Sequence, residues 1–199
     1  MKRRQLLILA AGALPGLPLL AANPAPHFEV PDTRMRKRSL SEFKGKTVVL
    51  EWTAATCPFV RAQYASGVMP ELQRAAAAQG TVWLSVISTH PSRRDYLPPD
   101  KAEAMHAGRG AASAALLMDS DGRMGRAYGA IVTPHMYVIA PSGELAYAGA
   151  ISDNATMSAA EARTSRNYVK AALEDLAAER KIATPSTRPF GCTIAYSGD

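Results

Sequence analysis

Short apolar runs alternate with helical patterns along the chain. The run at 47–52 is β-branched and apolar, which is typical of a strand buried on both faces of a sheet. A similar run covers 81–88, and shorter runs cover 115–118 and 136–139. A Pro-Ser-Gly turn after the last run, with a further apolar stretch at 145–149, predicts a hairpin.

Helical spacing fills the intervals between these runs. The first predicted helix covers 58–78, with a break near Gly67 and a restart at Pro70, and the second ends near Gly108. A short helix is predicted at 123–128. The last helix starts at Ser158, in a capping box, and continues to about Arg180. This order predicts an α/β domain with a mixed central β-sheet flanked by helices on both faces.

Residues 1–22 have the pattern of a secretory signal peptide. A cationic start at 2–4 precedes an apolar stretch at 6–20, which ends in small residues that suit a signal peptidase. Glycines and prolines inside this stretch disfavour a membrane-spanning helix, although an uncleaved anchor is the alternative. We therefore expect export by the Sec or twin-arginine route. A single periplasmic or secreted domain at 23–199, with no membrane association after cleavage, would remain.

Composition and charge exclude several classes of function. The chain has 199 residues, enough for one domain with a sizeable core. Its net charge of +6 falls to +3 without the cationic residues of the signal, which is too little to predict nucleic-acid binding. The basic run at 34–38 has no interleaved aromatic residues and fits a solvated strand-and-turn face. We predict no cofactor, because the chain has no dinucleotide-binding glycine motif, and no metal is expected in the leading interpretation.

The strongest candidate for chemistry is Cys57, one of only two cysteines. It lies where a buried strand meets a predicted helix start, with Pro58 suited to the first helical position. Unpaired backbone N–H groups and the helix dipole favour the thiolate there, and the thiolate is the nucleophilic form. The alternative is a buried structural cysteine. Thr133-Pro134 precedes a strand, an unusual place for proline unless the bond is cis or the strand lies at an edge.

These residues resemble the thioredoxin-like superfamily. The matching segments, in order, are Glu51-Trp52, Cys57-Pro58-Phe59-Val60, Thr133-Pro134 with the strand after it, and Gly191-Cys192-Thr193. More narrowly, the chain resembles secreted bacterial redoxins related to the alkyl hydroperoxide reductase/thiol-specific antioxidant family. The resemblance covers about 28–196 and implies a thioredoxin-like fold with a redox-active cysteine and antioxidant activity.

The resemblance also implies site residues. The backbone of Thr133 beside a cis Pro134 would hold a substrate as an added strand, with Trp52 as a further substrate-binding residue. Glu51 would be the acid buried behind the site, where it could support Cys57 as a proton relay; the alternative is a carboxylate at the edge of a strand. From its place one turn after Cys57, Arg61 is a candidate to support the thiolate, or else a residue that covers the helix surface.

Two departures from the known families limit the assignment. Val60 stands where thioredoxins have their second cysteine, so a disulfide within that motif is impossible. Peroxiredoxins place a threonine three residues before the cysteine, where this chain has Ala54.

Cys192 is the natural partner of Cys57. A site with one cysteine needs a resolving thiol to convert a sulfenic acid into a disulfide, and an extracytoplasmic chain with two cysteines tends to pair them. The leading interpretation is a thiol oxidoreductase that acts on a peroxide or a protein disulfide and needs an external thiol reductant. One alternative is a copper-handling protein that uses Cys57, Cys192 and His135. The other is a redox-silent scaffold in which the disulfide is a permanent staple.

Overall fold

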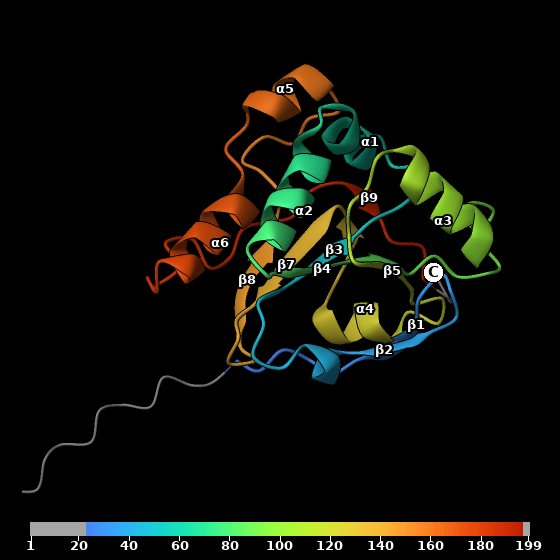
Figure 1. Cartoon of the computed structure of the whole chain (residues 1–199). Coiled ribbons are helices and arrows are strands. Elements are labelled where there is room, and N and C mark those ends of the chain that lie inside the picture. Colours follow the sequence, from blue (N-terminus) through green and yellow to red (C-terminus); the bar gives the residue numbers. More distant parts are fainter. Residues whose placement is uncertain (1–22, 197–199) are drawn as a thin grey trace, which may run out of the picture.

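The computed structural model describes residues 23–196, and the predicted signal peptide at 1–22 lies outside the described residues. At its centre is a five-stranded sheet in the order β5-β4-β3-β7-β8 (Figure 1). The strands are β3 (Val48–Trp52), β4 (Val82–Ile87), β5 (Ala115–Met118), β7 (His135–Ile139) and β8 (Leu145–Gly149). β3, β4 and β5 are parallel to one another, whereas β7 runs antiparallel to β3 and β8 runs antiparallel to β7. The predicted mixed sheet is therefore confirmed.

The central strand β3 carries two different sets of side chains. Val48, Leu50 and Trp52 belong to the apolar core on one face of the sheet, and Val49 belongs to the core on the other. All five residues of the strand are buried, as its continuous apolar pattern predicts. Glu51 shares the face of Val49 because side chains alternate along a strand, which places a carboxyl group inside the second core.

Helices cover both faces of the sheet, as predicted (Figure 1). α1 (Pro58–Ala65), α2 (Val68–Ala78) and α6 (Tyr168–Ala177) contribute to the core on the face of Val49, and α3 (Pro99–Gly108) packs on β5. α4 (Arg123–Tyr128) contributes to the opposite core, together with the hairpin of β1 (Glu29–Pro31) and β2 (Lys37–Ser39) and with Phe43 of a short 3-10 helix, η1 (Leu40–Phe43). None of the helices in the described part is long and apolar enough to cross a membrane.

The predicted C-terminal helix is divided in two. α5 (Ala159–Thr164) ends at Ser165, whose backbone is extended, and α6 starts after Asn167. The Asn167 side chain accepts a hydrogen bond from the Lys170 N–H at 2.9 Å and so caps a new helix. The predicted single helix from 159 to 180 is therefore wrong, because a second N-cap interrupts it. The earlier break is confirmed near Gly67, although α2 begins at Val68 rather than at Pro70.

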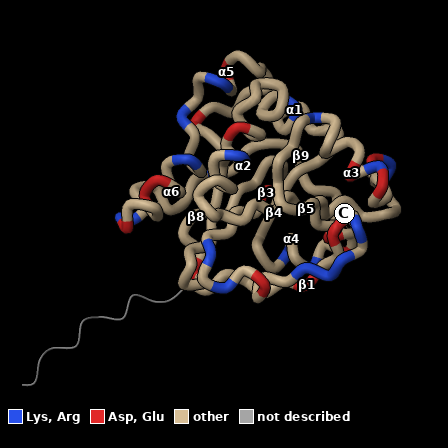
Figure 2. The backbone as a smooth tube through the Cα atoms, in the orientation of Figure 1, with Lys and Arg blue, Asp and Glu red and all other residues tan. Residues whose placement is uncertain are grey.

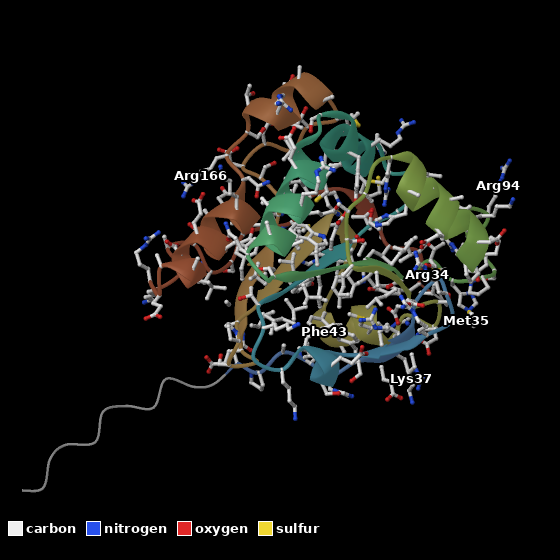
Figure 3. The ribbon with its side chains drawn as sticks, viewed as in Figure 1. Arg34, Met35, Lys37, Phe43, Arg94 and Arg166 are labelled. Carbon is white, nitrogen blue, oxygen red and sulfur yellow. The ribbon has the colours of Figure 1, made fainter. Side chains whose placement is uncertain are left out.

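The basic run at 34–38 lies on the β1–β2 hairpin (Figure 2). Arg34 and Lys37 project from it on the side of the molecule away from Arg166 (Figure 3). Arg36 pairs with the buried carboxylate of Asp32 at 2.8 Å. The run is thus the strand-and-turn face that the sequence predicts, partly neutralised by its own carboxylate.

Candidate functional site

The backbone places Cys57 between the end of β3 and the start of α1. Cys57 is the N-cap residue of α1, and Pro58 is the first helical residue. The Cys57 carbonyl accepts the first helical hydrogen bond, from Arg61 N–H at 3.0 Å. The side chain is 1% exposed. The predicted position at the first helical turn is confirmed.

The loop containing Pro134 faces this thiol. The Thr133–Pro134 peptide bond is cis, and the Cys57 thiol donates to the Thr133 carbonyl at 3.0 Å. β6 (Val132–Thr133) immediately precedes the proline. The loop that the resemblance assigns to substrate binding therefore contacts the candidate nucleophile directly.

The second cysteine reaches the same loop from the far end of the chain. β9 (Cys192–Thr193) pairs antiparallel with β6, so that Cys192 lies opposite Thr133. Both cysteines are free thiols, and the Cys192 side chain lies close enough to Cys57 to affect its pKa. The two residues are brought together but are not bonded to each other in this structure, which has a reduced site.

The two thiols have opposite acidities. Burial alone would raise the pKa of Cys57, but hydrogen bonds from the Cys192 thiol, the Thr133 side chain and backbone N–H groups outweigh it, so the pKa is lowered. The Thr133 carbonyl can only accept, and it holds the proton of the neutral thiol. Burial, followed by the hydrogen bond and charge of Cys57, raises the pKa of Cys192 to about 12. Cys57 is thus the more acidic thiol of the two.

A continuous C-terminal segment, residues 185–196, carries Cys192 across the site. We call this segment the strap. In Figure 1 it is the red trace that crosses the middle of the molecule from the side of α6 toward β5. The Phe190 ring packs on Phe59, the second residue of α1, with ring centroids 5.9 Å apart. The strap therefore helps to keep Cys57 from solvent.

A buried hydrogen-bond network surrounds Glu51. Its carboxylate accepts from Tyr64 at 2.8 Å, from Gln73 and Trp83 at 2.9 Å each, and from Ser85 at 3.1 Å. Burial raises the pKa of Glu51, although these donors and the charge of Arg109 oppose the shift. None of the hydrogen bonds found in the described part of the chain joins Glu51 to Cys57. Glu51 is the buried acid of the cysteine face, and a role in support of Cys57 stays a prediction.

Arg109 is a residue that sequence analysis did not find. Its guanidinium donates to Thr53 at 3.0 Å and to the carbonyl of Ala54 at 3.4 Å, in the loop that leads to Cys57. It also lies over the Tyr64 ring, 4.1 Å from the centroid. No local pattern marks this arginine, which comes just after α3. The Glu51 network, in contrast, could have been found from the sequence. Glu51 is a charged residue within a run that predicts a buried strand, and a buried carboxylate needs hydrogen-bond donors around it.

Two further residues were predicted to belong to the site, Trp52 and Arg61. Trp52 is fully buried in the core and donates its indole N–H to Ser88 at 3.0 Å. It has no exposed surface for a substrate, so we place it in the core rather than in the binding surface. Arg61 is exposed on α1, and its support of the thiolate stays a prediction.

The described residues do not form the metal site that the copper alternative requires. His135 is buried, and burial lowers its pKa to about 4. Its Nδ1 atom lies 3.2 Å from the Tyr137 hydroxyl and 3.4 Å from the Ile131 N–H. Within residues 23–196, no group of three or more His, Cys, Asp and Glu side chains is arranged to hold a metal ion. The three residues proposed as copper ligands do not form a cluster.

Sequence comparison identifies a family for most of the chain. The model of the AhpC/TSA family matches residues 21–148. This range includes Cys57 and Pro134 and ends before the strap. No curated protein sequence matches the chain. The match supports a redoxin-type oxidoreductase function that depends on thiol chemistry.

Comparison of structures confirms the thioredoxin-like fold. A hypothetical protein from Sinorhizobium meliloti has a TM-score of 0.71 at 21% identity, over 91% of this chain and 97% of that chain. An uncharacterized conserved protein from Geobacillus kaustophilus has a TM-score of 0.75 at 19% identity, over 89% and 93%. The thioredoxin domain of a thiol-disulfide oxidoreductase from Bacteroides vulgatus has a TM-score of 0.50 at 19% identity, over 64% and 86%.

Proposed function

Because this chain belongs to the AhpC/TSA family, we propose that it is a thiol-dependent oxidoreductase with Cys57 as the nucleophile and Cys192 as the resolving thiol. The observation that carries the proposal is the placement of both cysteines at the cis-proline loop: the Cys57 thiol donates to the Thr133 carbonyl at 3.0 Å, and Cys192 pairs with Thr133 across β6 and β9. The pKa of Cys57 is lowered and that of Cys192 is raised, which agrees with these roles. A nucleophile must be a thiolate at working pH, whereas a resolving thiol can remain protonated until its turn.

The reaction then has two steps. The Cys57 thiolate attacks an oxygen of a hydroperoxide, an S–O bond forms as the O–O bond breaks, and the alcohol or water leaves after it takes up a proton. Cys57 is now a sulfenic acid. The Cys192 sulfur attacks it, an S–S bond forms, and the sulfenic oxygen leaves as water with the Cys192 proton. A protein disulfide is the other substrate class, and it would give a mixed disulfide with Cys57 instead.

An external thiol reductant completes the cycle. Two thiols of the reductant reduce the Cys57–Cys192 disulfide by exchange and leave as their own disulfide. The chain has two cysteines in total, so no further thiol of its own can do this.

We also propose that the protein works outside the cytoplasm. The N-terminal pattern at 1–22 supports export, after which 23–199 would act as a single domain. Disulfides form and persist in such compartments, which suits a catalytic cycle that passes through one.

The test follows both cysteines after oxidation. The reduced mature protein receives one equivalent of hydrogen peroxide, and intact mass and peptide mapping follow it over seconds to minutes. We expect the loss of two hydrogens, mapped to a Cys57–Cys192 disulfide. The matched variant Cys192→Ser should retain a sulfenic acid on Cys57, trapped by dimedone.

Two outcomes would contradict the proposal. If both thiols stay free under peroxide and under a small activated disulfide, Cys57 is not the nucleophile. If the disulfide forms but resists physiological dithiols, the crosslink is a permanent staple rather than a catalytic intermediate.

A further inference from the structure

The strap occupies the position where an extended substrate would pair. β6 is the backbone edge beside cis Pro134, and β9 pairs with it, with Val132 opposite Thr193 and Thr133 opposite Cys192. The Ile194 N–H continues the pairing by donating to the Ile131 carbonyl at 3.1 Å. A peptide added to this edge would need the same backbone groups, which the chain's own residues already use.

Gly191 brings the strap into direct contact with the loop. Its φ of +141° belongs to a region that favours glycine, and a Cβ atom there would collide with the Thr133 carbonyl and touch the Pro134 nitrogen. The strap thus lies against the backbone of the cis-proline loop itself. No space remains between them for a second chain.

The strap is anchored before the site. The Thr187 N–H donates to the Ala148 carbonyl of β8 at 3.1 Å. The Thr187 hydroxyl accepts from the Ala150 N–H at 2.9 Å and lies 2.6 Å from the Tyr147 hydroxyl. These bonds fix the upstream end of the strap at the edge of the central sheet.

It is also anchored after the site. Ile194 and Tyr196 are buried in the core that contains α4. The Tyr196 hydroxyl donates to the Ala130 carbonyl at 2.7 Å, and its ring lies against Gly122 and Gly125. Residues 188–193 therefore span the cysteine site between two fixed points, with Phe190, Gly191 and Cys192 over Cys57.

We propose that the strap is a built-in occupant of the peptide-binding edge, which reserves Cys57 for small hydroperoxides and for Cys192 and excludes protein disulfides. This inference rests on the proposed function. A hydroperoxide needs only a small local opening to reach a thiol that is 1% exposed, whereas a peptide needs β9 to leave β6. Pairing with β9 presents Cys192 to Cys57 in the way a substrate cysteine would be presented.

The same arrangement selects the sulfur that the reductant attacks. Cys192 is half-buried, and Cys57 is enclosed. In the oxidised protein, an external thiolate forms an S–S bond with the Cys192 sulfur, and the Cys57 sulfur leaves as a thiolate. The Cys57 sulfur is the better leaving group, because the pKa of Cys57 is lower than that of Cys192. A second thiol of the reductant then releases Cys192.

The experiment measures how Cys57 reacts with an extended peptide relative to a small analogue. Full-length mature protein with Cys192→Ser keeps the strap and leaves one thiol. It reacts with a ten-residue peptide whose central cysteine carries a 5-thio-2-nitrobenzoate mixed disulfide, and with N-acetylcysteine activated in the same way. We expect the peptide to react about tenfold or more slowly than N-acetylcysteine, with hydrogen peroxide reacting readily.

Gly191→Ala in the same background displaces the strap, because its Cβ meets the Thr133 carbonyl. The ratio of peptide to N-acetylcysteine rates should rise about tenfold. Gly143→Ala is the matched control, since Gly143 also has a positive φ, of +88°, but has open space around it. Thr187→Val, which removes the upstream hydroxyl anchor, should raise the ratio by a smaller factor. Amide hydrogen exchange at residues 190–196 shows, for each variant, whether β9 has separated from β6.

A parent protein that reacts with both disulfides at equal rates overturns the proposal. So does an unchanged ratio in a variant whose strap exchanges hydrogen freely. A Cys57 that reacts with neither disulfide nor peroxide would instead overturn the proposed function.

Discussion

The two cysteines are held by different parts of the molecule. Cys57 is positioned by its immediate neighbours: β3 ends before it, α1 starts after it, and the residue lies deep in the core. Cys192 is positioned by distant residues, through pairing of β9 with β6 and through the anchors at Thr187 and Tyr196. One side chain belongs to the rigid centre of the fold, and the other to a segment laid over it.

This difference explains the division of chemistry. The cysteine in the core has a lowered pKa, to which the Cys192 side chain on the strap contributes, and a lowered pKa suits a nucleophile. The cysteine on the strap keeps its proton, because its pKa is raised, and β9 is joined to β6 by only two residue pairs. A segment with few pairings can shift locally without unfolding the core. In the proposed cycle, the nucleophile would therefore lie in the core, and the cysteine that changes partners would lie on the segment with few pairings.

The sharpest test of this division is to remove each thiol in turn. Cys57→Ser should reduce steady-state peroxide consumption by more than about 10³-fold, because no other residue supplies the nucleophile. Cys192→Ser should still consume one equivalent rapidly and then turn over about tenfold or more slowly with a dithiol reductant. The measurement is peroxide loss in a stopped-flow instrument, with burst and steady-state phases separated.

Ser66→Ala is a suitable control, since its buried hydroxyl bonds only locally, within the turn between α1 and α2. Its burst and turnover should match those of the parent protein. Equal losses in both cysteine variants would break the division, because they would show that neither thiol acts without the other.

Local features of the site could be read from the sequence. The buried strand at 48–52, the helix start at Pro58 and the proline before the strand at 135–139 each follow from a few neighbouring residues. Burial, capping and the fixed φ of proline act over such distances. For that reason the position of Cys57 was predictable without any knowledge of tertiary contacts.

Long-range features were not predictable in the same way. The resemblance implied that the Thr133 backbone holds a substrate as an added strand, and pairing of the chain's own β9 at that place was not foreseen. Trp52 was assigned to the binding surface although the core encloses it, and Arg109 carries no local pattern. Each of these depends on which distant segments meet, and periodicity along the chain does not encode that.

The acidity of Cys57 is a finer test of the contact between the two regions. Cys192→Ala removes a donor from the Cys57 sulfur, so the pKa of Cys57 should rise and its thiolate fraction should fall. At pH 7 its alkylation by iodoacetamide should slow about fivefold, as expected for the loss of one hydrogen bond. The measurement is the rate of alkylation between pH 5 and 10, mapped by mass spectrometry.

Cys192→Ser is the matched variant, because its hydroxyl retains a donor. Its midpoint should lie between that of the parent protein and that of Cys192→Ala. If all three profiles coincide, the strap does not set the acidity of Cys57, and the helix start alone does.

The smallest effect on turnover is expected from a substitution of Glu51, the buried acid on β3. Burial raises the pKa of Glu51, so the folded protein holds a proton that the unfolded chain releases at lower pH. Stability from this group is complete below the unfolded pKa and is lost as the pH rises through the folded pKa. Glu51→Gln should therefore remove a fall in stability that the parent protein shows as the pH rises above about 4.5. Urea unfolding between pH 4 and 9 measures it.

Turnover of Glu51→Gln should change by less than about threefold, since the amide keeps an acceptor for Gln73, Trp83 and Ser85 and no described bond joins residue 51 to Cys57. Ser88→Ala, on the opposite face of the sheet, is the comparison, because it disturbs a second buried acid, Asp119. A large loss of turnover in Glu51→Gln with stability intact would make Glu51 part of the proton path of Cys57. β3, which carries Glu51, would then take part in the chemistry and not only support Cys57.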